Sequence, residues 1–172
     1  MFRKIPTVVI TLLSIGILVL AATLWAGRRT QSYSVLLDTT GQTSTTEFEV
    51  GVNRPDVYAV SLIYPYTDPV GRAKAWALAG GATFQGNSWQ EQGAPFVFEI
   101  RINEISSGKE ILNKRVAHPG LTSWGTEWLS AELVSIKLVE GAYRVLVNRS
   151  GSVVEAPPEA LQLRLSEAHK GK

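Results

Sequence analysis

Apolar and polar residues alternate in short runs along most of the chain after residue 32, and few folds can use such a pattern. A period of two puts every second side chain on the same face, which is typical of a β-strand with one buried face. Phe96, Phe98, Ile100 and Ile102 form the clearest run. Similar runs cover 33–37, 48–52, 58–64, 110–116, 133–138, 143–147 and 161–165. The pattern predicts an all-β, Ig-like two-sheet sandwich of about eight strands.

Two turn signals join some of these runs into pairs. The polar segment 106–109 predicts a hairpin between 96–105 and 110–116. Glu140-Gly141 predicts a second hairpin, between 133–138 and the strand that begins near Tyr143. In Ig-like sandwiches a tyrosine at such a corner donates its hydroxyl to nearby backbone, and we expect the same of Tyr143.

One short helix is expected between the third and fourth runs. Asp68 can cap its N-terminus, Pro69 suits its first turn, and Gly80-Gly81 can end it. No second helix follows, so the segment does not build a βαβ unit.

The N-terminal segment Thr7 to Ala26 has no charged residue. Twenty helical residues span about 30 Å, the thickness of the hydrocarbon core of a bilayer, so we expect a transmembrane anchor. A cleaved signal peptide is the alternative, which the length of the run and the large residues before its candidate cleavage sites disfavour. The expected organisation is a cytoplasmic tail, anchor and linker over 1–31, a β-sandwich over 32–166 and a polar tail over 167–172.

Basic residues near both ends of the apolar segment explain most of the positive charge of the chain. Four of the 17 Lys and Arg residues lie there, so the remainder is slightly acidic against 15 Asp and Glu. A nucleic-acid partner is therefore not expected, because such a domain presents a basic face. The early pair Arg3 and Lys4 favours a cytoplasmic N-terminus, and hence a single-pass inner-membrane protein with a periplasmic C-terminal domain.

The sequence offers little material for catalysis. It has no cysteine, no metalloprotease, esterase or P-loop motif, and two histidines, His118 and His169. Glu127, between two tryptophans, is the one carboxylate with apolar neighbours, and no second carboxylate pairs with it. We therefore expect no enzyme activity, no metal and no cofactor.

Tryptophans are the more informative residues. Trp89, Trp124 and Trp128 fall in segments without alternation, which we interpret as loops. An indole in a loop can anchor a protein interface or stack on a sugar ring, or it can plug an open end of the sandwich. Trp76, on the predicted helix, has the same packing interpretation.

The chain resembles a group of uncharacterised proteobacterial envelope proteins, a domain of unknown function. The resemblance covers roughly Tyr33 to Ser166 and rests on Tyr64-Pro65, Gly80-Gly81, Pro95, the segment 120–128 and the corner at 138–143. It implies a β-sandwich held at a membrane by a lipid or a helix. Because the chain lacks a cysteine for lipid attachment, it would use its helix.

These observations together favour a membrane-anchored periplasmic binding module with a protein partner. An immunity protein that neutralises a toxin and an accessory subunit of an envelope or secretion complex are two versions of this expectation. The alternative is a carbohydrate or cell-wall binding domain that uses Trp89, Trp124 and Trp128.

Overall fold

The computed structural model describes residues 32–85, 88–152 and 159–168, and for 84, 85, 88 and 89 it describes the backbone alone. The predicted anchor, Thr7 to Ala26, lies outside the described residues. Within the described ranges, no helix combines the length and the apolar character that crossing a bilayer requires.

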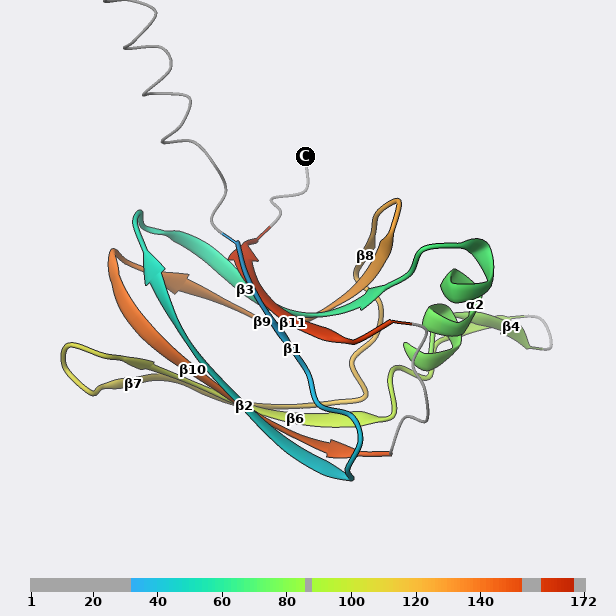
Figure 1. The fold of residues 1–172 in the computed structure, drawn as a ribbon, viewed down its shortest axis with the longest axis horizontal. Coiled ribbons are helices and arrows are strands. Elements are labelled where there is room, and N and C mark those ends of the chain that lie inside the picture. The colour runs from blue at the N-terminus through green and yellow to red at the C-terminus, as the bar shows by residue number, and fades with distance from the viewer. Residues whose placement is uncertain (1–31, 86–87, 153–158, 169–172) are drawn as a thin grey trace, which may run out of the picture. The chain divides into compact units, whose positions relative to one another are not determined.

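Eleven strands and one helix form the described part of the chain (Figure 1). In chain order they are β1 (Ser32–Leu36), β2 (Thr43–Val52), β3 (Asp56–Pro65), α2 (Pro69–Leu78), β4 (Thr83–Gln85), β5 (Ser88–Gln90), β6 (Phe96–Glu104), β7 (Glu110–Ala117), β8 (Ser123–Trp124), β9 (Trp128–Leu138), β10 (Gly141–Gly151) and β11 (Gln162–Glu167). One antiparallel sheet has the order β1-β11-β3-β9-β8 and the other β2-β10-β6-β7, while β4 and β5 pair with each other. The prediction of a two-sheet β structure with one short helix is confirmed.

The topology is that of a jelly roll. Without the two-residue β8, eight strands remain in the two sheets, and consecutive strands lie in opposite sheets except for β6 and β7. This alternation produces the two Greek keys of a jelly roll. In an Ig-like sandwich the first two strands are neighbours in one sheet, so the Ig-like prediction is wrong. Periodicity shows which face of a strand is buried, but it does not show which sheet the strand joins.

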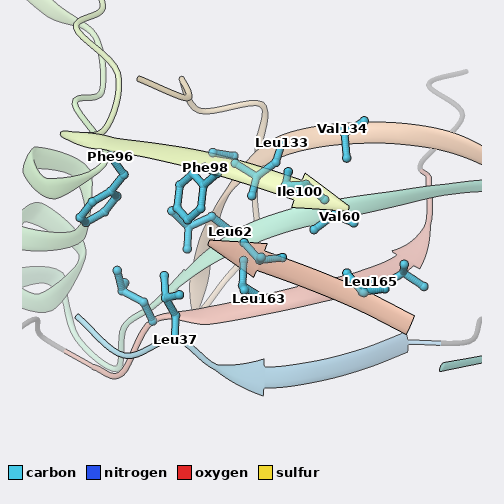
Figure 2. Close-up of a cluster of buried hydrophobic side chains, with 14 of the residues drawn as sticks. Leu37, Val60, Leu62, Phe96, Phe98, Ile100, Leu133, Val134, Leu163 and Leu165 are labelled. Atoms are coloured by element: carbon cyan, nitrogen blue, oxygen red, sulfur yellow. The ribbon is translucent and has the colours of Figure 1, made fainter. Parts of the chain in front are cut away.

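The core lies between the two sheets. Phe96, Phe98, Ile100 and Ile102 of β6 are fully buried on one face, as their alternation predicted. Figure 2 shows part of this cluster, in which β6 side chains meet Leu62 and Leu163 of the five-stranded sheet. Full burial of each such side chain contributes about 1.5–3 kcal/mol to the free energy of folding. This apolar layer holds the two sheets together.

One predicted hairpin is confirmed and the other is wrong. Strands β6 and β7 pair across the turn at 105–109. Strand β9 instead pairs with β3, and β10 pairs with β2 and β6, so Glu140-Gly141 carries the chain from one sheet to the other. Both strands turn apolar residues inward, and each finds its partner in a different sheet.

Two tyrosines secure the crossings between the sheets. The Tyr143 hydroxyl donates to the carbonyl oxygen of Val139 at 2.9 Å, as predicted. The Tyr58 hydroxyl makes the equivalent bond to Arg54 at 3.2 Å, four residues before it at the β2–β3 crossing. Each bond gives a hydrogen-bond donor to a backbone carbonyl in the connection between two strands, outside the hydrogen bonding of the sheets.

The helix begins and ends as predicted. Asp68 is its N-cap and accepts a hydrogen bond from the Gly71 amide at 2.6 Å. Gly80 follows the helix with a φ of 60°, a conformation that favours glycine. The helix lies beside the open rim of the sandwich (Figure 1).

The sandwich has two opposite ends. We call the end with α2, β4, β5 and β8 the helical end, and the end with the connections 53–55, 105–109 and 139–140 the corner end. Strand β3 runs from Asp56, opposite Leu138 at the corner end, to Pro65, opposite Trp128 at the helical end.

The domain extends one residue beyond the expected boundary at Ser166. Glu167 belongs to β11, and its carboxylate forms a two-pronged ion pair with Arg54. This pair raises the pKa of Arg54 above its ordinary value. The polar tail expected from residue 167 therefore begins no earlier than 168.

Candidate functional site

The helical end gathers the residues that the sequence singled out. Trp124, Trp128, His118 and Glu127 all belong to strands or connections of this end, and so does the backbone of Trp89. None of the three candidate tryptophans lies in a loop: they belong to β5, β8 and β9. Strands β5 and β8 are too short to show an alternating pattern, so they could not be predicted from periodicity.

Trp124 is a solvent-facing indole on a fixed support. Its side chain is 68% exposed, the highest value among the large apolar residues described as exposed. The backbone around it is held by Tyr66, whose hydroxyl donates to the Gly125 carbonyl at 2.8 Å and whose amide donates to the Glu127 carbonyl at 2.9 Å. The Gly125 amide closes the turn on the Trp128 carbonyl at 2.8 Å. The indole is therefore presented on an ordered hairpin.

Trp128 is occupied by intramolecular contacts. The Arg164 guanidinium lies 5.9 Å from its ring centroid, within cation–π range. A Cβ at Gly125 would lie 2.5 Å from the indole, so the turn packs directly on the ring. Trp128 thus supports the hairpin that carries Trp124. Trp76 also packs against the core, and its indole N–H donates to the Ala82 carbonyl at 3.3 Å.

His118 joins the loops of the helical end. Its φ is 50°, its amide donates to the Phe96 carbonyl at 2.9 Å, and its Nδ1 lies 3.2 Å from the Ala94 carbonyl oxygen. A Cβ at Gly93 would lie 2.1 Å from the His118 carbonyl oxygen. The hydrogen bonds described for this histidine are with backbone groups, which is typical of a structural residue.

The carboxylates near these loops do not converge on the histidine in the contacts that the structure describes. Glu91 accepts a hydrogen bond from the Leu121 amide at 2.8 Å, and Glu127 is exposed. Across the described ranges, no three His, Asp or Glu side chains cluster as metal ligands.

Arg149 is a key residue of this end that the sequence reasoning missed. It is 1% exposed, its Nε donates to the Asp38 carbonyl and the Ser44 hydroxyl, and its two other nitrogens donate to the Gly41 and Ser152 carbonyls. Burial lowers its pKa below the ordinary value of arginine. One guanidinium thus fixes the β1–β2 connection to the end of β10. Arg149 follows Tyr143, Val145 and Val147 in the alternation of β10, so the periodicity of this strand could have predicted that it is buried.

Tyr64 is a buried polar residue near the same end. Its side chain is fully buried, and its hydroxyl has no hydrogen-bond partner within the described part of the chain. Burial raises the pKa of this phenol well above its ordinary value. It was predicted as a core residue of its strand, and its position agrees.

Among solved structures, a protein from Sulfurospirillum deleyianum has a similar fold. It superposes with a TM-score of 0.60 at 13% identity, over 81% of this chain and 99% of that one. An Arthrobacter globiformis isomalto-dextranase complexed with panose gives a TM-score of 0.35 at 18% identity, over 71% of this chain and 16% of that one. The VP2 subviral particle of infectious bursal disease virus gives 0.32 at 10% identity, over 81% and 33%. Only the first similarity is high enough to show the fold.

The sequence comparisons identify the family. No curated protein matches the chain. The family model described as a domain of unknown function, DUF5625, matches residues 35–166, which agrees with the resemblance seen from 33 to 166. Because this match covers most of the chain, the protein belongs to the DUF5625 family.

Proposed function

We propose that this protein is a membrane-tethered binding module of the bacterial periplasm whose helical end engages a protein partner. Residues 7–26 would provide the tether in the inner membrane, with the N-terminus in the cytoplasm. An immunity protein and an accessory subunit of an envelope or secretion complex both fit this description.

Trp124 is the observation that carries the proposal. Truncation of tryptophan is among the most costly changes at protein interfaces, where a few large side chains dominate the binding energy. A hairpin backbone that is already held in place loses little conformational freedom on binding. Trp124 is exposed, and its hairpin is fixed by Tyr66 and Trp128.

The direction of the strands supports the choice of the helical end. Strand β1 begins with Ser32, which pairs with Ser166 near the corner end. The proposed tether therefore joins the domain toward its corner end. The helical end lies at the opposite end of the strands from the residue at which the tether would join the domain.

A protein partner fits the geometry better than a glycan does. Jelly rolls include lectins, so the fold itself allows sugar binding. A stacking platform built from Trp89, Trp124 and Trp128 would need free indole faces. Arg164 and Gly125 already contact the Trp128 indole, and of the two candidate indoles whose side chains the structure describes, Trp124 is the exposed one.

Site-specific photo-crosslinking tests the proposal. A photoreactive residue replaces Trp124 in the full-length protein in its native cells, and the matched control carries it at Ile105, 39% exposed at the corner end. We expect position 124 to crosslink to one defined protein, identified by mass spectrometry, and position 105 not to do so.

A second arm separates binding from folding. Trp124→Ala should abolish capture of the same protein and leave the thermal midpoint almost unchanged, because an exposed side chain contributes within about 0.5 kcal/mol to stability. Equal crosslinking from both positions would refute the proposal. Retention on purified peptidoglycan that depends on Trp124 would instead favour the carbohydrate alternative.

A further inference from the structure

The edges of the two sheets are not equally protected against pairing with another strand. In the described ranges these edges are β1, β2, β7 and β8. Strand β8 has two residues, β1 has five, and β7 carries Lys114 and Arg115. Short length and basic residues are common ways to protect an edge. Strand β2 has ten residues, no Lys, Arg or Pro, and an unbroken register with β10.

The hydrogen-bond pattern shows which backbone groups of β2 face outward. Opposite residues in an antiparallel ladder alternate between bonded and non-bonded pairs. The Gly151 amide donates to the Gln42 carbonyl at 3.0 Å, which makes these two residues a bonded pair. Counting in twos along the register, the N–H and C=O groups directed away from β10 belong to Thr45, Glu47 and Glu49.

One contact confirms this assignment independently. Gly51 belongs to the same alternating set, and its carbonyl oxygen accepts a hydrogen bond from the Tyr33 hydroxyl at 2.7 Å. A carbonyl bonded to β10 would not need this partner. Tyr33 therefore covers the corner end of the edge, while the stretch from Thr45 to Glu49 has no such cover among the described residues.

The side chains along this stretch define what could pair with it. Glu47 and Glu49 are exposed on the outer face, where they share the single guanidinium of Arg144 at 3.2 and 3.0 Å. Two carboxylates against one arginine leave a net negative charge. On the inner face, Phe48 is half-buried at the open side of the core.

A second copy of this chain does not suit the edge. Pairing β2 with β2 brings the two rows of glutamates together, and like charges on neighbouring strands are destabilising. An incoming strand with basic residues on its outer face and apolar residues on its inner face meets Glu47, Glu49 and Phe48 favourably.

We propose that β2 is a strand-addition site for an extended segment of another protein in which basic and apolar residues alternate. Backbone hydrogen bonds to residues 45–49 provide the affinity, and the two faces provide the selectivity. This inference is independent of the proposed role of Trp124, since the β2 edge does not include the β8–β9 hairpin.

Binding of a defined peptide tests the inference. The probe is acetyl-Thr-Val-Lys-Val-Lys-Val-Thr-amide, and its affinity for the full-length protein is measured by isothermal titration calorimetry. Glu47→Pro removes an outward N–H and blocks the edge without removing a bond to β10. Its matched control, Glu47→Gln, removes the same charge and keeps the N–H. We expect the proline variant to weaken binding at least about tenfold more than the glutamine variant.

Two further measurements do not depend on the proline variant folding normally. The same peptide N-methylated at its two lysines, whose N–H groups face β2 when they lie opposite Glu47 and Glu49, cannot form the ladder and should bind the unmodified protein at least about tenfold more weakly. The double variant Glu47→Gln/Glu49→Gln should weaken binding and reduce its salt dependence. No binding of the parent peptide at millimolar concentration, or equal binding of the N-methylated one, would overturn the inference.

Discussion

Three buried tyrosines differ in a single hydrogen bond, which allows a direct test of the energetics of the core. Tyr58, Tyr64 and Tyr143 are at most 2% exposed. The hydroxyls of Tyr58 and Tyr143 donate to backbone carbonyls, whereas the Tyr64 hydroxyl has no partner among the described residues. Replacing each tyrosine with phenylalanine removes the hydroxyl and keeps the ring.

The expected change has opposite signs at the two kinds of position. Burying an unpaired hydroxyl costs about 1–3 kcal/mol. Tyr64→Phe should therefore raise the free energy of unfolding by about 1–2 kcal/mol, because the empty space left by one oxygen offsets part of the gain. Tyr143→Phe should lower it by about 0.5–1.5 kcal/mol, the net contribution of one hydrogen bond.

Urea unfolding of the full-length chain, followed by tryptophan fluorescence, measures both changes. The midpoint should move up for Tyr64→Phe and down for Tyr143→Phe, with the slope unchanged. A lower midpoint for Tyr64→Phe would refute the reasoning, since it would mean that this hydroxyl makes a stabilising interaction.

Substitutions at four other positions test the loops, the buried charge and a surface carboxylate. Arg149→Met should lower the free energy of unfolding by about 2–4 kcal/mol in the same assay, because several backbone carbonyls lose their donor, and a lysine should not rescue it. Gly93→Ala should lower the free energy of unfolding by more than about 3 kcal/mol. Gly108 also has a positive φ, but no atom lies within 4 Å of its new Cβ, so Gly108→Ala should lower the free energy of unfolding by about 1 kcal/mol. Asp38 accepts hydrogen bonds from the Thr40 amide and hydroxyl, which hold its pKa below 3.8. Its stabilisation is therefore present above pH 3.8 and is lost as the pH falls through the folded-state pKa, so Asp38→Asn should flatten acid unfolding in that window.

Local patterns predicted local structure well. The alternation in 96–102 predicted a buried face, and every residue of that face is fully buried. Asp68 and Gly80 marked the limits of the helix, and Tyr143 forms its expected corner bond. In each case the residues that determine the local structure lie within a few positions of it in the sequence.

The failures came from partners that are distant in the sequence. Glu140-Gly141 has the composition of a hairpin turn, but β9 and β10 find their partners in different sheets. Arg149 was not singled out from the sequence, because the loop that its guanidinium binds lies more than 100 residues earlier. The support for Trp124 likewise depends on Tyr66, 59 residues before the glycine that it holds.

The pairing of the first strand with the last has a practical consequence. Ser32 lies opposite Ser166, so the polypeptide enters and leaves the domain side by side. Nearby ends permit circular permutation and insertion into a host protein. A short flexible bridge between positions 168 and 32, with new ends opened in the exposed turn 106–108, should give a permuted domain with the same jelly roll. The domain is thus suited to transplantation as a unit.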